Sequence, residues 1–483
     1  MAIDTAAVTP TAEQKAIIDA ARSGLELVVQ AGAGTGKTAT LRMVAEHALP
    51  GEKITYIAYN KAIAKEAAAS FPEHVQCRTA HSLAHQVVGH KYRHRLSGPR
   101  QTARRAAELL GTSWLDLGRE VHVTPAQIAR VAVETVMRFC HSADEEIRHK
   151  HVPPQNGIVA DDHNALAQTV LPYARRAWAD LQDPDGMLRF EHDHYLKMWA
   201  LTRPVLQSAV VMLDEAQDSN PVVAQVVQDQ DHAQRLIVGD SNQSMYEWRG
   251  AVDALSNWQA DQRLFLSQSW RFGPAVAEEA NKWLAQLDTE LRLTGNRALA
   301  SRLVPLSAPK AVLCRTNAEA MNQVMTMLDD GRRVALVGGG AAISRLAEAA
   351  ADLKAGRRTS HPELYVFTTW GALQEYVETE AAGRDLKPFV DLIDTHGTDA
   401  VIAAVNELVD ETRCNTTVST AHKAKGREWE SVKIADDFTE PKEQDIRGKG
   451  QIAKADAMVA YVAVTRARKL LDRGSLAWID GYR

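Results

Sequence analysis

The feature that most constrains the fold is a glycine-rich loop between a short apolar run, Leu25–Gln30, and a helical pattern that starts at Lys37. Glycine lets backbone N–H groups turn toward phosphate oxygens without a clash from Cβ, and the start of a helix adds partial positive charge. We therefore expect Lys37 to contact the β- and γ-phosphates of a nucleotide and the Thr38 hydroxyl to contact Mg²⁺. The alternative, a glycine-rich turn beside a surface lysine, is disfavoured by the strand–helix context. The loop's other residues are Ala31, where the general pattern has glycine, and Gly32, Ala33, Gly34, Thr35 and Gly36.

A second apolar run, Val210–Leu213, ends in two acids, Asp214 and Glu215. In open α/β sheets, ligands bind at the carboxyl ends of the strands, so both acids should face the nucleotide. We expect Asp214 to hold Mg²⁺ and Glu215 to orient and polarise the attacking water. The alternative, an acidic helix N-cap after a buried strand, is disfavoured by the loop at residues 31–38.

Short apolar runs alternate with helical patterns along the chain, which indicates α/β domains with buried parallel strands. The alternation breaks over residues 89–201 and again over 341–411, where mainly helical insertions are expected. One α/β domain then comprises residues 1–88 and 202–268, and the second comprises residues 269–340 and 412–483. The expected strands are Leu25–Gln30, Ile54–Tyr59, Val210–Leu213, Leu236–Val238, Ala311–Cys314, Val334–Val337, Thr416–Thr420 and Val432–Ile434.

Composition narrows the class of protein. The chain is 45% hydrophobic and 24% charged with a net charge of −5, which excludes collagen-like and broadly disordered chains. Four widely spaced cysteines, and the lack of an apolar run of the ~20 residues that cross a bilayer, lead us to expect a cytoplasmic protein. The charge is uneven, because residues 90–107 hold six Lys and Arg and no acid, whereas residues 371–411 hold ten Asp and Glu against two Lys and Arg. The basic segment suits a phosphate-tracking surface, with a solvated basic face as the alternative.

Further motifs follow these two in a recognisable order. With them, the chain resembles the superfamily 1 DNA helicases of the UvrD/Rep type over residues 11–470. The segments that carry the resemblance are Asp214–Asp218, Gly239–Ala251, Ser269–Arg271, Leu313–Asn317, Thr420–Trp429 and Tyr461–Ala467. Three others, Tyr59–Lys61, Thr79–Ser82 and His192–Trp199, are closer to the F-box DNA helicase branch.

The resemblance implies two RecA-like domains with ATP in the cleft between them. It assigns phosphate-sensing roles to Arg271 and Arg466, and an arginine in this role accelerates phosphoryl transfer by roughly 10³–10⁵. Gln14 matches an adenine contact, although Thr11-Ala-Glu-Gln14 also fits a helix capping box. The other implied ATP contacts are Gln243 on the γ-phosphate, Trp270 on the adenine, Glu428 on the ribose, and Gly426.

The same resemblance implies a path for single-stranded DNA. Trp248 lies in a polar, glycine-flanked segment, and a base stacked on such a ring gains roughly 1–3 kcal/mol without regard to sequence. Packing in the core is the alternative for this tryptophan. The other matching positions are Tyr59, Asn60, His81, Tyr246, Arg249 and His422, each with a core or cap role as its alternative.

We therefore expect an ATP- and Mg²⁺-dependent helicase that moves 3′→5′ along single-stranded DNA and unwinds duplex at junctions. The motif ending Trp248–Ala251 favours the 3′→5′ branch. Two departures from the UvrD/Rep pattern are Ala39, where an arginine is usual, and the short acidic insertion, which argues against a duplex-gripping role. Two alternatives remain, an RNA or RNA–DNA hybrid helicase and a nucleotide-gated DNA-binding subunit that recruits a nuclease. The expected partners are DNA and an unidentified nuclease, repair or replication protein, with no membrane.

Overall fold

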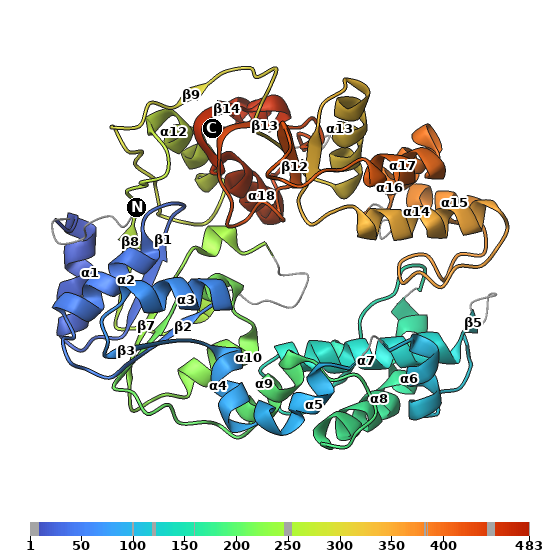
Figure 1. The fold of residues 1–483 in the computed structure, drawn as a ribbon, viewed down its shortest axis with the longest axis horizontal. Coiled ribbons are helices and arrows are strands. Elements are labelled where there is room, and N and C mark those ends of the chain that lie inside the picture. Colours follow the sequence, from blue (N-terminus) through green and yellow to red (C-terminus); the bar gives the residue numbers. More distant parts are fainter. Residues whose placement is uncertain are drawn as a thin grey trace. The chain divides into compact units, whose positions relative to one another are not determined.

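The computed structural model describes residues 9–98, 101–117, 122–158, 160–245, 254–380, 383, 385–441 and 450–482. These residues form two compact units (Figure 1). Unit 1 comprises residues 1–153 and 161–267, and unit 2 comprises residues 154–160 and 268–483.

Unit 1 is built on a six-stranded sheet with the strand order β3-β2-β6-β7-β1-β8. All neighbouring strands run parallel, so their carboxyl ends meet at one edge, where the segments after β1, β6 and β7 lie together. The strands are β1 (Leu27–Ala31), β2 (Ile54–Ala58), β3 (Val75–Thr79), β6 (Val210–Leu213), β7 (Gln234–Gly239) and β8 (Gln262–Leu266).

Helices cover this sheet, as a parallel sheet requires. Ile17, Val44 and Ala67, on three different helices, are buried in the same core as Val29 and Tyr56 of the sheet. The helices of this α/β part are α1 (Ala12–Arg22), α2 (Lys37–His47), α3 (Lys61–Ser70), α10 (Pro221–Gln228) and α11 (Ala254–Asn257).

The insertion of unit 1 is mainly helical, as predicted, with one hairpin of two-residue strands. Part of its basic segment is structural, because Arg95 is buried and donates to the carbonyl oxygens of Asp180, Leu181 and Leu188. The elements are α4 (Ala80–Val87), η2 (Gly89–Tyr92), α5 (Arg93–Leu96), α6 (Ala103–Leu110), β4 (Leu115–Asp116), β5 (His122–Val123), α7 (Pro125–His141), η3 (His149–His151), α8 (Ala160–Gln182) and α9 (His192–Leu201).

Unit 2 has a second six-stranded sheet, in the order β11-β12-β10-β13-β14-β9, again with parallel neighbours. Its strands are β9 (Arg302–Leu303), β10 (Ala311–Cys314), β11 (Val334–Leu336), β12 (Thr416–Thr420), β13 (Trp429–Ile434) and β14 (Ala467–Asp472). The accompanying helices are α12 (Pro274–Leu284), α13 (Asn317–Asp329), α18 (Lys454–Val464) and the C-terminal η8 (Gly474–Gly481).

The acidic insertion of unit 2 packs around apolar side chains. Leu353, Trp370, Phe389 and Ile393 are buried in one core with Met321 of α13. The insertion's helices are α14 (Ala341–Lys354), α15 (Trp370–Thr379), α16 (Lys387–His396) and α17 (Thr398–Asn406).

The α/β fold and the positions of the predicted strands are confirmed, and three strand predictions match to the residue: β6, β10 and β12. The first strand begins two residues later than predicted, because the Leu25 N–H donates to the Ala20 carbonyl at the end of α1. It ends one residue later than predicted, because Ala31 pairs with Leu266. Residues 154–160, predicted as part of the first insertion, belong to unit 2. There the Tyr365 hydroxyl donates to Gln155 Oε1 at 3.1 Å.

Candidate functional site

The glycine-rich loop connects β1 to α2 and is fixed at both ends. The Gly32 N–H donates to the Leu266 carbonyl of the neighbouring strand at 3.0 Å, and the Thr35 hydroxyl donates to the Gly32 carbonyl at 2.9 Å. Gly36 is the N-cap of α2 with φ 80°, a left-handed conformation that favours glycine. The loop therefore presents the start of α2 toward the carboxyl edge of the sheet, as a phosphate site needs.

Lys37 and Glu215 form an ion pair across this edge, with Nζ 3.1 Å from Oε1. Burial alone would lower the pKa of Lys37, but the charges of Glu215, Asp214 and Asp240 outweigh burial and raise it. The lysine is therefore cationic and lies among acids. Phosphate oxygens would offer it an alternative anionic partner.

Asp214 accepts two hydroxyl hydrogen bonds on the same oxygen. Thr38 Oγ1 lies 2.8 Å from Oδ2, and the Tyr56 hydroxyl lies 2.6 Å from it. Burial, followed by the charge of Glu215, raises the pKa of this fully buried carboxyl. A carboxylate and a hydroxyl in contact form a hard-oxygen donor set of the kind that Mg²⁺ prefers, so the two predicted ligands fit one cation.

Tyr56 was not among the predicted site residues. It lies within β2, and its hydroxyl pKa is raised by burial and by the charge of Asp214. A tyrosine in a strand that is otherwise apolar is a usable signal, because a buried phenol generally needs a hydrogen-bond partner. Only the sheet order, which places β2 beside β6, identifies that partner as Asp214.

Glu215 has an unusual backbone, with φ 50° and ψ 43°, a conformation that costs a non-glycine residue about 1–3 kcal/mol. Its N–H donates to Asp214 Oδ1 at 2.8 Å, and its Oε2 accepts from Gln217 Nε2 at 2.6 Å. These contacts aim the side chain at Lys37. The residue predicted to polarise water is therefore held in one orientation by its neighbours.

Gln243 is buried beside the same edge, in the short helix η5 (Ser241–Gln243) that follows β7. Its Nε2 donates to Asp240 Oδ2 at 2.6 Å. Three predicted DNA-binding residues that follow it, Tyr246, Trp248 and Arg249, lie outside the described residues.

Gln14 forms the capping box that was its structural alternative. Its Oε1 accepts from the Thr11 N–H at 3.0 Å, and Thr11 Oγ1 accepts from the Gln14 N–H at 3.2 Å. Its Nε2 donates to Thr40 Oγ1 of α2 at 3.1 Å. The adenine contact stays a prediction.

In unit 2, the segments before α12, before β13 and after α18 bring Arg271, Glu428 and Thr465 together. Arg271 Nε donates to Glu428 Oε2 at 2.7 Å, and its Nη1 lies 3.4 Å from the Thr465 carbonyl oxygen. Trp270, the predicted adenine platform, is 49% exposed. Gly426 has φ 78° in the turn that precedes Glu428. These four predicted ATP contacts thus lie on one unit.

Arg466 is only 1% exposed, unlike Arg271. Its guanidinium donates to the Val462 carbonyl at 2.9 Å, to the Arg427 carbonyl at 3.3 Å and to the Thr465 hydroxyl at 3.1 Å. It therefore fixes the turn between α18 and β14. Its phosphate-sensing role stays a prediction.

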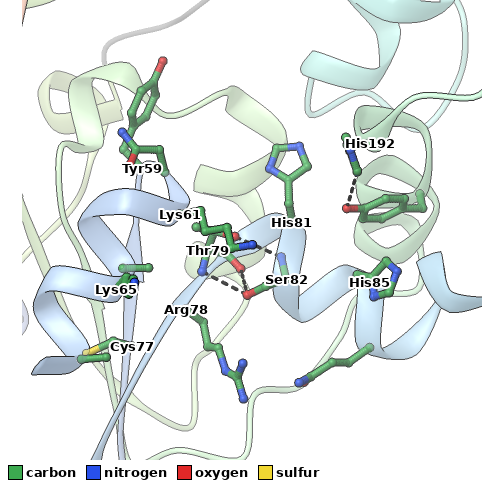
Figure 2. A pocket seen from close by; sticks show the side chains of 15 residues that line it. Tyr59, Lys61, Lys65, Cys77, Arg78, Thr79, His81, Ser82, His85 and His192 are labelled. Atoms are coloured by element: carbon green, nitrogen blue, oxygen red, sulfur yellow. Dashed lines mark hydrogen bonds between the residues drawn. The ribbon is translucent and has the colours of Figure 1, made fainter. Parts of the chain in front are cut away.

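A groove of about 790 Å³ on unit 1 collects three of the predicted DNA contacts, Tyr59, Asn60 and His81 (Figure 2). Its wall comes from the start of α3, from β3 and α4, and from α9 of the insertion. Among the residues that the structure describes, the lining of this groove contains no acid. Its other members are Lys61, Ala64, Lys65, Ala68, Cys77, Arg78, Thr79, Ser82, His85, Gln86, His192 and Tyr195. A concave surface with cationic and aromatic side chains suits a nucleic-acid backbone with stacked bases.

Asn60 and His81 also have structural partners. Asn60 Oδ1 accepts from the Ile63 N–H at 3.0 Å as the N-cap of α3, so its cap alternative is present. His81 Nε2 lies 3.1 Å from Asp193 Oδ1, which His141 also approaches at 3.6 Å. Burial would raise the pKa of Asp193, but the two imidazoles hold it well below its usual range. Tyr59 is 52% exposed.

The seventh predicted DNA contact, His422, lies half-buried after β12 in unit 2. It is therefore on a different unit from the groove. Among the residues that the structure describes, no helix has the length and apolar character needed to cross a membrane.

Two family models match this chain. Residues 11–262 match the model of the UvrD/REP helicase N-terminal domain, and residues 391–472 match that of the UvrD-like helicase C-terminal domain.

Two curated relatives extend the match to nearly the whole chain. F-box DNA helicase protein 1 of Schizosaccharomyces pombe is 27% identical over 95% of this chain and 57% of its own length. F-box DNA helicase 1 of Gallus gallus is 26% identical over 95% of this chain and 48% of its own length. The chain thus spans about half the length of these relatives.

Proposed function

The chain belongs to the UvrD/REP helicase family, and from this premise we propose that it hydrolyses ATP with Mg²⁺ to move 3′→5′ along single-stranded DNA and unwind duplex. The observation that carries the proposal is the meeting of Lys37, Thr38, Asp214 and Glu215 at the carboxyl edge of the unit 1 sheet. An acid-free groove with three predicted DNA contacts lies on the same unit.

In the proposed reaction, the ATP phosphates take the place of Glu215 as the partner of Lys37. Glu215 then accepts a hydrogen bond from the attacking water, while the backbone N–H groups of the loop bind phosphate oxygens. Mg²⁺ held by Thr38 and Asp214 would neutralise charge on the phosphates. We assign to Arg271 and Arg466 of unit 2 the stabilisation of charge on the transferred phosphoryl group.

For DNA, we propose that the groove lined by Tyr59, Asn60 and His81 holds the strand. The cations Lys61, Lys65 and Arg78 would bind backbone phosphates, and Tyr59, which is half exposed, would stack on a base. Such contacts do not depend on base identity, as a translocating enzyme requires.

ATPase and strand-displacement assays test the proposal. Lys37→Ala is expected to abolish ATP hydrolysis stimulated by single-stranded DNA, whereas Lys15→Ala, on an exposed face of α1, serves as the matched control. The wild-type protein should displace a strand from 3′-tailed duplexes. Displacement only from 5′ tails would contradict the polarity, stimulation by RNA alone would contradict the substrate, and full hydrolysis by Lys37→Ala would contradict the nucleotide site.

A further inference from the structure

Two buried side chains that the proposed mechanism does not use, Gln217 and Asp240, lie between the water-polarising acid and the predicted γ-phosphate contact. Gln217 is 1% exposed and Asp240 is 0% exposed. They lie after different strands, β6 and β7, which are neighbours in the sheet. Both therefore face the carboxyl edge where Lys37 and Glu215 form their ion pair.

Both the nitrogen and the oxygen of the Gln217 side-chain amide form hydrogen bonds. Its Nε2 donates to Glu215 Oε2 at 2.6 Å, and to Asp218 Oδ2 at 3.2 Å. Its Oε1 accepts from the Asp240 N–H at 2.9 Å. The side chain thus ties the acid after β6 to the backbone after β7.

Gly239 shows that the fold reserves space for this amide. A Cβ on Gly239 would lie 2.2 Å from Gln217 Oε1 and 2.6 Å from Leu255 Cδ1, both too close for real contacts. Its φ is not in the left-handed region, so a side chain here is disfavoured by this close approach, which would displace the Gln217 amide, and not by backbone conformation.

Asp240 continues the connection to the predicted γ-phosphate contact. Its Oδ2 accepts from Gln243 Nε2 at 2.6 Å, and its Oδ1 accepts from Gln30 Nε2 at 3.2 Å and from the Asn242 N–H at 3.1 Å. The carboxylate therefore holds Gln243 turned toward itself, just as Gln217 holds Glu215 turned toward Lys37.

We propose that Gln217 and Asp240 are positioning residues that join Glu215 and Gln243 into one hydrogen-bonded unit. When a γ-phosphate draws Lys37 and Gln243 to itself, the two connected amides shift together and Glu215 is released toward the water. The inference rests on the proposed function, because it assumes that ATP occupies the loop. It adds that the acid becomes active only when the γ-phosphate is present.

A double-mutant cycle between Gln217→Met and Gln243→Ala tests this coupling. We expect each variant to lower kcat by about tenfold and the pair to be no slower than the slower single variant, because residues in one network are not additive. In Gln217→Met, binding of a fluorescent non-hydrolysable ATP analogue should change by less than about twofold, because Gln217 is not a predicted nucleotide contact. Gln225→Met, on an exposed face of α10, is the matched control.

A second variant separates the two bonds of Gln217 and guards against misfolding. Gln217→Glu keeps the length and the acceptor for the Asp240 N–H but replaces the donor to Glu215 with a like charge. It should therefore be at least as slow as Gln217→Met, and thermal melts of both variants, with assays kept below the lower melting temperature, separate a loss of coupling from a loss of folded protein. Losses that multiply in the double variant, or a normal kcat for Gln217→Glu, would overturn the coupling. Lys37→Ala in the same assay distinguishes a failure of this coupling from a failure of the proposed function, because only intact hydrolysis by Lys37→Ala would contradict the proposed function.

Discussion

The two units differ in the charges that their predicted site residues carry at the ends of the strands. In unit 1 the carboxyl ends of the strands carry buried acids, Asp214 and Asp240, whose charges help to raise the pKa of Lys37. In unit 2 the predicted site residues lie beside the amino ends of β13 and β14 and are arginines: Arg271 is paired with Glu428, and Arg466 is held largely by backbone carbonyls. Two parallel sheets of six strands can thus present different chemistry, because the loops and not the strands carry it.

Hydrolysis of a phosphoanhydride needs side chains that hold the metal ion and the attacking water. It also needs positive charge next to the transferred phosphoryl group. We propose that residues of unit 1 perform the first task and that arginines of unit 2 perform the second. Variants in the two units should therefore fail in distinguishable ways.

The largest effect is expected in unit 2. Arg271→Ala should lower the DNA-stimulated kcat by about 10³, because the arginine stabilises charge that develops during phosphoryl transfer. Arg468→Ala is the matched control, since Arg468 also approaches Glu428, at 3.7 Å, but is not a predicted phosphate contact. Steady-state ATPase assays measure both. Equal losses in the two variants would show that the arginines act only by fixing Glu428.

Next in size is the removal of the acid in unit 1. Glu215→Gln should lower kcat by about 10², because an amide cannot accept a proton from the attacking water. Binding of an ATP analogue should persist, since Lys37 loses a competing anion. Glu66→Gln, on an exposed face of α3, is the control. A normal kcat for Glu215→Gln would move the role of base to another residue.

In unit 1, the nucleotide-site residues that were predicted from sequence lie in two short continuous segments. The loop at 31–38 and the acids at 214–215 are contiguous, so composition and order identify them. Tyr56, Gln217 and Asp240 were missed because each acts through a partner on a neighbouring strand, and the order β2-β6-β7 is a property of the sheet and not of any segment.

In unit 2 the limit of sequence reasoning is different. Arg271 and Arg466 both match motif positions, yet one is partly accessible and the other is buried in the turn before β14. A buried arginine needs many acceptors, and here backbone carbonyls from α18 and from the segment before β13 supply them. Carbonyls carry no side-chain signature, so this burial is invisible in the sequence.

Acid should destabilise unit 1 through His194. Burial lowers the pKa of this imidazole to about 4, and its Nδ1 accepts from the Glu191 N–H as part of the cap of α9. Between the folded value and the ordinary value of about 6.5, the unfolded chain binds more protons, so stability falls as the pH falls through this window. The expected loss from pH 7 to pH 5 is about 2 kcal/mol.

The contribution of His194 to this loss of stability can be measured from the unfolding of wild type and His194→Gln at pH 7 and pH 5. Glutamine at the same position keeps a capping-box acceptor but does not titrate, so the variant should lose less stability on acidification. Within the described ranges, the buried histidines, His151 and His194, both belong to unit 1. Equal losses in wild type and variant would assign the acid sensitivity to other groups.

The smallest effect concerns Asn60, which serves as a helix cap in this structure and is also a predicted DNA contact in the groove of unit 1. Serine caps nearly as well as asparagine but is shorter, so Asn60→Ser should keep the melting temperature, whereas Asn60→Ala should lose about 1 kcal/mol of stability. If the amide also reaches DNA, both variants should weaken binding to single-stranded DNA by about threefold, as expected for one lost hydrogen bond. Fluorescence anisotropy and thermal melts separate the two quantities.

Thr124→Ala is the control for this test, because Thr124 caps α7 and does not line the groove. It should lower stability like Asn60→Ala but leave DNA affinity unchanged. Wild-type affinity in Asn60→Ser would show that Asn60 only caps α3. DNA binding in the groove would then depend on Tyr59, His81 and the cations of the groove. Charge alone would then distinguish the groove from the nucleotide edge of unit 1, where acids lie.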